Sequence, residues 1–330
     1  MGTYYRIQVA GEEMSEDRRR TLHEAAVAEM DAVDASMSTY LEDSEVSRFN
    51  RHPDPTPFAV SAETFEVLRT ALEISARTGG AFDVTVGPLV ETWGFGPGAE
   101  PPRQLEDEEI EALLGRIGYD QLTLDEAAST VAKSLGGIHC DLSGIAKGYA
   151  VDRVAERLAS LGVADFWVEI GGEVRAAGSN AGGTAWRLGI ERPLFLPGTV
   201  QRIVPLDDMA VATSGDYRNY REVDGDRYSH LIDPRSGRPI GHHLASVSVF
   251  HPRCAIADAW ATALMVLGEE EGYELAVAED LAALFLVRDG DEVVELATPA
   301  FETVEAGRIL NPSSSSRQSV KPGQARVGKI

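Results

Sequence analysis

The chain has 330 residues, of which 43% are hydrophobic and 25% are charged, a composition typical of a folded globular protein with one large or two ordinary domains. It carries 30 lysines and arginines against 53 aspartates and glutamates, a formal net charge of −23 at pH 7. So acidic a surface repels the phosphates of nucleic acids and of anionic membranes, and no apolar run approaches the roughly 20 residues that span a bilayer. The composition therefore argues against nucleic-acid partners and against a membrane span in this chain.

The cysteines and the N-terminus carry no signal for a particular compartment. Cys140 and Cys254 are far apart and lie in no zinc or disulfide motif, so buried free thiols are expected. The first residues, MGTYYRIQVA, run into a strand-like pattern without a basic or apolar signal region. Two interpretations stay open: a cytoplasmic protein, or one whose export signal is missing from this chain.

In the N-terminal part, apolar residues at helical spacing predict helices over 18–37 and over 61–80, the second with a serine N-cap and two glycines as its stop. A short acidic helix is predicted over 106–114. Residues 37–50 form a polar segment that is predicted as a loop. Residues 79–98 combine a strand-like FDVTV with closely spaced Gly and Pro, a pattern typical of a loop that packs closely or serves a site.

The C-terminal part predicts strands and helices in alternation. Residues 138–162 indicate a short strand, a Ser-Gly turn and a helix, and the segments 166–178 and 186–193 are predicted as two strands of one sheet. Further predicted elements are β-rich segments at 209–220 and 227–240, a strand at 246–250, helices over 257–267 and 273–278, and a hairpin of 283–287 with 292–296. Residues 309–330 contain few large apolar side chains and are expected to be a flexible tail behind a folded unit of 1–308.

The predicted helix that opens at Ser143-Gly144 is a candidate anion site. Unpaired N–H groups at a helix start, with Lys147 in the first turn, suit a phosphate, and Asp141 just before them suits a hydroxyl or amine of the same ligand. An ordinary junction between a strand, a glycine and a helix has the same pattern, so the structural alternative stays open.

A second candidate is the pair Asp258 and Thr262, four residues apart on one predicted helix face. A carboxylate and a hydroxyl are hard oxygen donors of the kind that Mg²⁺ takes. The alternative is an N-cap aspartate followed by an ordinary threonine. Zinc is less well supported, because the sequence has no HExxH motif and no cysteine cluster.

A third candidate is His230, in a stretch otherwise made of turn residues. The ordinary pKa of histidine, near 6.5, suits a general base, although a lone histidine also serves as a structural group. No GxSxG, Walker A or GxGxxG motif lies in a convincing context. The residues by themselves therefore indicate a Mg²⁺-assisted site for a phosphorylated ligand and do not name the ligand.

The chain resembles the ApbE family of FAD:protein FMN transferases in eight stretches that keep the family's order. These stretches are MGT (1–3), MSTYLEDSEVSRFN (37–50), GGAFDVTVGPLVETWGFGP (79–97), DLSGIAKGYAVD (141–152), EIGGEVRAAG (169–178), VATSGDYRNY (211–220), HLIDPRSGRPI (230–240) and ADAWATAL (257–264).

The resemblance implies a mixed α/β fold, a two-lobed single catalytic unit with mixed sheets and flanking helices and with the flavin in the cleft. It implies an enzyme that uses Mg²⁺, cleaves FAD, releases AMP and joins FMN through a phosphoester to a Thr or Ser of an acceptor flavoprotein. Carried over residue by residue, the metal would bind the backbone carbonyl of Gly144 and the side chains of Asp258 and Thr262. FAD contacts would come from Met1, Tyr40, Ala81, Phe82, Asp83, Asp141, Lys147 and Ile232. Beside this set, His230 is the candidate that takes the acceptor proton.

Two other functions use the same residues. A Mg²⁺-dependent FAD pyrophosphatase would replace the acceptor by water, and a flavin-binding carrier would perform no chemistry. Asp258 and Thr262 disfavour the carrier, because binding alone does not need a metal pair. Many relatives carry a signal or lipoprotein segment, so the resemblance favours an extracytoplasmic, periplasmic location. No signal or lipobox is visible here, which keeps a cytoplasmic location open.

Overall fold

The computed structural model describes residues 2–11, 13–53, 55–95, 99, 103–193, 199–216, 220–223, 226–290, 292–307 and 328–329. These residues form a mixed α/β fold, which confirms the predicted fold class. Both cysteines are buried and free, as expected. Within the described part of the chain, no helix is long and apolar enough to cross a membrane.

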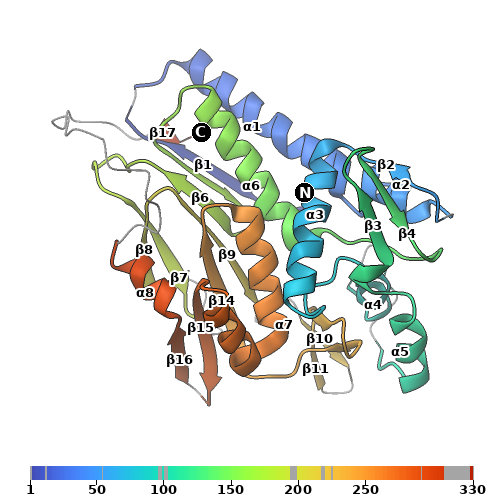
Figure 1. Cartoon of the computed structure of the whole chain (residues 1–330). Coiled ribbons are helices and arrows are strands. Elements are labelled where there is room, and N and C mark those ends of the chain that lie inside the picture. The colour runs from blue at the N-terminus through green and yellow to red at the C-terminus, as the bar shows by residue number, and fades with distance from the viewer. Residues whose placement is uncertain are drawn as a thin grey trace.

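A large antiparallel sheet forms the centre of the molecule (Figure 1). In spatial order its strands are β16 (Glu292–Ala297), β15 (Ala282–Asp289), β14 (Leu244–His251), β9 (Met209–Gly215), β6 (Glu173–Ala177), β5 (Phe166–Ile170), β1 (Tyr5–Val9) and β17 (Gly328–Lys329). All but the last residue of β14 are buried, as expected for a central strand that is covered on both faces. The predicted hairpin of β15 and β16 is confirmed.

Four helices cover one face of this sheet. They are α1 (Glu16–Met37), α3 (Ala62–Arg77), α6 (Ser143–Ser160) and α7 (Cys254–Ala278). Helix α6 packs on β5 and β6, α7 packs on β9 and β14, and the two helices pack against each other (Figure 1). Helix α1 lies outside α6, and α3 contacts both α6 and α7. The predicted serine cap of α3 is confirmed, since the Ser61 side chain accepts from the Thr64 N–H.

Helix α7 contains a kink where the sequence predicts two helices. Gly268 has φ 81°, a conformation outside the helix that glycine adopts without strain. A Cβ at this position would lie 2.8 Å from Cδ2 of His242, so the ring packs against the bare backbone. The kink separates the two predicted helices without a loop between them.

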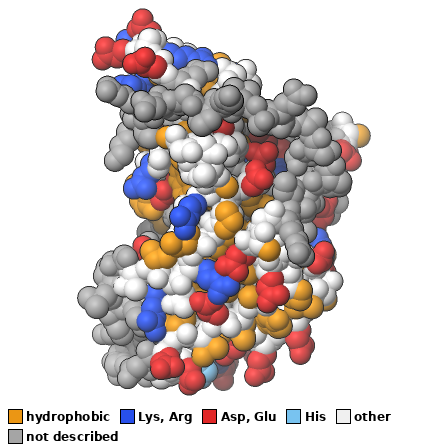
Figure 2. Space-filling model, turned by 90° about the vertical axis from the view of Figure 1, so that its left-hand side faces the viewer, with side chains coloured by type: hydrophobic (Ala, Val, Ile, Leu, Met, Phe, Trp, Pro, Cys, Tyr) orange, Lys and Arg blue, Asp and Glu red, His pale blue; other side chains and the backbone are white. Residues whose placement is uncertain are grey.

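The opposite face of the large sheet is covered by a two-stranded sheet and a helix. These are β7 (Trp186–Glu191) with β8 (Val200–Leu206), and α8 (Pro299–Glu305). Arg202 of β8 forms ion pairs with Glu295 (2.7 Å) and Glu305 (2.6 Å). Figure 2 views the molecule from the side and shows acidic and basic side chains next to each other among apolar ones.

The prediction that 166–178 and 186–193 belong to one sheet is wrong. The first segment is itself a hairpin, β5 and β6, that turns at Gly171-Gly172 with φ values of 65° and 108°. The second contains β7, which pairs with β8 and packs Trp186 against Trp167 of β5, with ring centroids 6.0 Å apart. Only two residues of β7 are buried, so one of its faces covers the large sheet and the other is more open.

Shorter elements complete the end of the molecule that carries α3. The three-stranded sheet consists of β2 (Phe58–Ala59), β4 (Thr130–Lys133) and β3 (Leu122–Asp125); the helices are α2 (Glu45–Arg51), α4 (Gly87–Thr92), α5 (Asp107–Leu114) and the 3₁₀ turn Tyr119–Gln121; and two small hairpins pair β10 (Tyr220–Val223) with β11 (Asp226–Ser229) and β12 (Ile232–Asp233) with β13 (Arg238–Pro239). The acidic helix predicted over 106–114 is confirmed as α5.

Three local predictions are wrong. The predicted loop over 37–50 contains α2, which Ser44 caps by accepting from the Ser47 N–H at 3.0 Å. The strand-like FDVTV forms a turn that leads into α4, with no strand over the described residues 82–86. The short strand predicted before α6 is an irregular segment, because Asn50 binds both the N–H and the carbonyl of Cys140 and takes the place of a neighbouring strand.

Of the predicted tail 309–330, the structure describes Gly328 and Lys329, which pair with Gln8 and Val9 at the edge of the large sheet. The remaining residues of the tail lie outside the described part. The boundary at residue 308 therefore stays a prediction.

Candidate active site

A cavity of about 1100 Å³ brings the predicted site residues together. Its lining includes Tyr40, Ala81, Phe82, Asp83, Asp141, Gly144, Lys147, His230, Ile232, Asp258 and Thr262. Met1, the remaining predicted FAD contact, lies outside the described residues. These side chains come from segments spread over more than half of the sequence, so the fold assembles them at one place.

The start of α6 forms one wall of the cavity. Oδ1 of Asp141 accepts from the Ser143 N–H at 2.9 Å and thereby caps the helix, whose N-cap residue Leu142 has no polar side chain. A Cβ on Gly144 would lie 3.0 Å from the Phe82 ring and 3.2 Å from Oγ1 of Thr262. Glycine therefore lets this helix start approach α7 closely, and the anion site predicted at Ser143-Gly144 faces the cavity.

Helix α7 places Asp258 and Thr262 in the same wall. The helix begins at Cys254, with Arg253 as the N-cap residue, so Asp258 lies in the second turn and the N-cap alternative is wrong. Asp258 is 2% exposed, and its Oδ2 accepts from the Gly148 N–H of α6 at 2.9 Å. Oγ1 of Thr262 lies 3.5 Å from Oγ of Ser214. The two predicted metal ligands share one helix face, as their spacing requires.

Sequence reasoning missed Glu173, the first residue of β6, which is 4% exposed. Nζ of Lys147 lies 3.0 Å from Oε1 of Glu173 and 3.5 Å from Oδ1 of Asp258, so two carboxylates flank one ammonium. Burial raises the pKa of Glu173 to about 7, although the Lys147 charge acts in the opposite direction. Partial burial lowers the pKa of Lys147, but the two carboxylates outweigh it and hold that pKa above its ordinary value. Asp258 is therefore not the only carboxylate at this point.

The oxygens around Asp258 fit a hard dication. Oδ1 of Asp258 and the Thr262 hydroxyl make only long contacts of 3.5 Å, and Oε2 of Glu173 is buried without a hydrogen-bond partner. In the described chain, no group of three or more His, Cys, Asp or Glu side chains meets the requirements of a metal site. A metal here would thus need hydroxyl, backbone or water oxygens beside Asp258, which is the ligand set that Mg²⁺ accepts.

The loop that follows α3 lines the cavity next to the start of α6, where the Asp141 N–H donates to the Val84 carbonyl at 2.6 Å. The Asp83 carboxylate accepts from the Thr85 N–H (2.8 Å), the Thr85 hydroxyl (2.6 Å) and the Tyr119 N–H (2.8 Å). Burial raises the pKa of Asp83, and these hydrogen bonds act against that rise. The carboxylate therefore shapes the loop that presents Ala81 and Phe82 to the cavity.

His230 and Ile232 reach the cavity from the segment between β11 and β13. Ile232 is buried in a small core with Leu89 and Trp93 of the α4 region, and Trp93 Nε1 donates to the Gly237 carbonyl at 2.9 Å. The half-buried ring of His230 lies edge-on to Phe95, with centroids 6.4 Å apart. Tyr40, by contrast, is 72% exposed at the rim.

The ApbE family model matches residues 1–285 of the chain. The chain belongs to the ApbE family. A curated FAD:protein FMN transferase of Vibrio cholerae is 45% identical over 302 residues, which cover 92% of this chain and 90% of that protein. The corresponding protein of Haemophilus influenzae is 41% identical, with 92% and 88% covered.

Solved ApbE structures share the fold. The flavin transferase ApbE from Vibrio cholerae matches with a TM-score of 0.84 and 43% identity, over 92% of this chain and 96% of that one. The apo form of the Pseudomonas stutzeri flavinyl transferase ApbE matches with a TM-score of 0.81 and 40% identity over the same shares. Membership of the ApbE family, expected from the eight stretches, is confirmed.

Proposed function

We propose that the protein is an FAD:protein FMN transferase, which splits FAD and attaches FMN to a Thr or Ser hydroxyl of an acceptor flavoprotein. The relatives that carry this name match nearly the whole chain. The observation that carries the proposal is the single cavity that unites a helix start suited to phosphate, a lysine, an oxygen donor set on α7 and a histidine.

In the proposed reaction the acceptor hydroxyl attacks the FMN phosphorus of FAD. A new P–O bond forms to the acceptor, the P–O bond to the AMP moiety breaks, and AMP leaves with the bridging oxygen. His230 takes the hydroxyl proton, and Lys147, in the first turns of α6, binds the pyrophosphate oxygens. Mg²⁺ bound by Asp258, Thr262 and the Gly144 carbonyl would supply neutralisation of the pyrophosphate charge.

The test is incubation with FAD, Mg²⁺ and a candidate acceptor flavoprotein, followed by mass spectrometry of protein and nucleotide. Transfer predicts an acceptor mass increased by FMN less one water, with one AMP released for each adduct. FMN and AMP without an adduct would instead identify an FAD pyrophosphatase. Bound FAD that stays intact in the presence of a competent acceptor would identify a carrier and contradict the proposal.

A further inference from the structure

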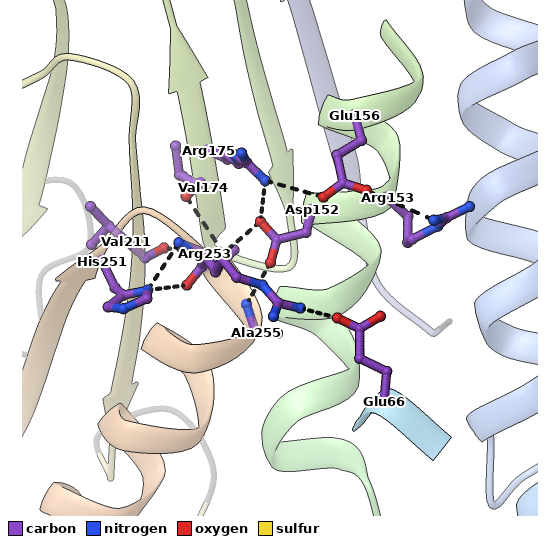
Figure 3. Close-up of polar contacts among 11 residues, drawn as sticks. Glu66, Asp152, Arg153, Glu156, Val174, Arg175, Val211, His251, Arg253 and Ala255 are labelled. Carbon is purple, nitrogen blue, oxygen red and sulfur yellow. Dashed lines mark hydrogen bonds and ion pairs between the residues drawn. The ribbon is translucent and has the colours of Figure 1, made fainter. Parts of the chain in front are cut away.

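The start of α7 is held by a carboxylate that belongs to another helix. Asp152 of α6 is 2% exposed and accepts from the N–H groups of Cys254 at 2.9 Å and Ala255 at 3.0 Å (Figure 3). A helix start leaves such N–H groups without partners inside the helix, and the N-cap residue Arg253 provides no side-chain cap. Asp152 supplies the missing acceptor from outside the helix, where the helix dipole also favours its negative charge.

The same face of α6 holds α7 at a second point, one turn away. Gly148, four residues before Asp152, donates its N–H to Oδ2 of Asp258 at 2.9 Å. A Cβ on Gly148 would lie 2.4 Å from the Cys254 carbonyl oxygen and 2.8 Å from Cβ of Asp258, so the two helix backbones are in direct contact. Asp152 and Gly148 together fix the position of α7 along α6.

Two ion pairs also connect strand β6 to α6 near its contact with α7. In one pair β6 supplies the basic residue, and in the other it supplies the acidic residue. Arg175 donates to Oδ1 of Asp152 at 2.7 Å, while Glu173 accepts from Lys147 at 3.0 Å. Residues two apart in a strand point to the same side, so both pairs join the same face of β6 to α6. Figure 3 shows Arg175 and Asp152 meeting between the strand and the helix, beside the start of α7.

We propose that Asp152 is a positioning residue for the reaction centre, a role that rests on the proposed function. Through the first turn of α7 it sets the distance from Asp258 and Thr262 to the start of α6. Removing the carboxylate would leave two buried N–H groups without an acceptor and Arg175 without this partner. The first turn of α7 would shift or fray, and the candidate metal ligands would separate although every one of them is still present.

The test compares Asp152→Asn, Asp152→Ala and Arg175→Met with the wild type. Asp152→Asn keeps the shape of the side chain but removes its negative charge, and its single carbonyl oxygen can replace only one of the two carboxylate oxygens that accept from the N–H groups. Binding of Mn²⁺ is followed by electron paramagnetic resonance, FAD binding by fluorescence, and transfer by AMP release over a range of Mg²⁺ concentrations. We expect the half-saturating Mn²⁺ and Mg²⁺ concentrations to rise about 10–100-fold in Asp152→Ala, as for residues that orient metal ligands, and less in the other two.

A matched control is Thr298→Val. Thr298 is fully buried and accepts from two N–H groups, those of Phe301 at 3.3 Å and Ala283 at 3.0 Å, but it does not line the cavity. This variant should lower the melting temperature and leave the half-saturating metal concentrations unchanged. The control therefore separates a loss of stability from a loss of positioning.

The inference would be overturned if the Asp152 variants have the same half-saturating metal concentrations as the wild type and lose activity only in proportion to the unfolded fraction. If Asp152→Ala does not fold, Asp152→Asn and Arg175→Met decide by the same criterion. Wild-type protein that neither binds Mn²⁺ nor releases AMP contradicts the proposed function and the inference together. Wild-type protein that does both, beside unchanged variants, overturns the inference alone.

Discussion

Asp258 and Glu173 are both buried, and the single ammonium of Lys147 forms ion pairs with both of them. If both carboxylates are ionised, about one negative charge is left over in a region of low dielectric constant, which is costly without a further cation. A bound dication would offset this charge, which is the electrostatic argument for the proposed metal site. Asp258, with its long contact at Oδ1, is the side chain that a dication would approach.

Removal of the Asp258 carboxylate tests this directly. Asp258→Ala should abolish Mg²⁺-dependent transfer and hydrolysis of FAD together, because only the neutral Thr262 hydroxyl and Gly144 carbonyl remain of the proposed ligands, and Glu173 is paired with Lys147. FAD binding should weaken but persist, and Thr262→Val should show a milder form of the same loss. Asp31→Ala on the exposed face of α1 is the charge-matched control. AMP release at the wild-type rate from folded Asp258→Ala would refute the metal assignment.

A second prediction about a single residue concerns His230. If it accepts the proton of the acceptor hydroxyl, His230→Ala should lower turnover by roughly 10²–10⁴, the usual contribution of a general base, with FAD affinity near wild type. Single-turnover AMP release and FAD titration on the same preparation measure both quantities. An unchanged turnover would assign the proton to solvent or to another group.

At the scale of elements, the close contact between α6 and α7 depends on Gly148. Gly148→Ala would place a methyl group 2.4 Å from the Cys254 carbonyl oxygen, and neither backbone can move without parting the helices. We expect a loss of about 1–3 kcal/mol in the free energy of unfolding, typical of overpacking, together with weaker metal binding.

The control for this substitution is Gly115→Ala at the end of α5. Gly115 has φ −64°, and the nearest atom to a Cβ there is 3.6 Å away, so stability should stay the same or rise by about 0.4–1 kcal/mol. Urea unfolding of both variants decides the matter. Equal stabilities would show that the two helices yield at Gly148 without strain.

His251, the last residue of β14 and three residues before α7, also predicts a pH dependence of stability. Nδ1 of His251 accepts from the Arg253 N–H at 2.9 Å, and burial lowers the pKa of His251 below its ordinary value. The unfolded chain therefore binds this proton more readily than the folded chain does, so the stabilising contribution exists above about pH 6.5 and is lost as the pH falls below it.

Comparison of wild type with His251→Gln isolates this contribution. Urea unfolding at pH 7.5 and pH 5.5 should show a smaller loss on acidification in the variant than in the wild type. Equal losses in both proteins would mean that His251 titrates alike in the folded and the unfolded chain.

At the scale of the whole molecule, the cavity is acidic like the rest of the protein. Among the residues that the structure describes, its lining holds six carboxylates and three basic side chains, namely Asp83, Asp141, Glu169, Glu173, Glu191 and Asp258 against Arg6, Lys147 and Arg187. A nucleotide that carries a pyrophosphate is therefore repelled both by the net charge of −23 and by the local surroundings.

Without divalent metal, FAD should associate faster as salt is added, because screening shortens the reach of this repulsion from about 30 Å at 0.01 M to about 8 Å at 0.15 M. Stopped-flow fluorescence measures the rate, and riboflavin, which has no phosphate, serves as the control without salt dependence. A rate that falls with salt would show that the three basic side chains dominate the encounter.

The sequence predicts those parts of the site that lie close together in the chain. Helical periodicity places Asp258 and Thr262 on one face, and the helix start brings Ser143, Gly144 and Lys147 into one turn. Glu173 could not be found in this way, because its partner Lys147 lies on another element and only the packing of β6 on α6 joins them.

Local errors have similar causes. The apolar residues before α6 have the composition of a strand, yet the side chain of Asn50, about 90 positions earlier, provides the hydrogen bonds that a neighbouring strand would give. Helix α2 was hidden because its sequence is polar and only Val46, Ser47 and Phe49 of it are buried. A long-range contact decides against the local pattern in the first case, and a small buried face conceals the helix in the second.

The strand order of the large sheet has a consequence for how the protein is made. From β1 to β16 the strands lie in space in the order in which they occur in the chain, and β17 then joins the free edge of β1. During synthesis each new strand can add to the edge of the one made before it, and none has to be inserted between two strands already paired. Helix α7 with Asp258 emerges between β14 and β15, so a nascent chain gains this candidate metal ligand only after five strands of the sheet have been synthesised.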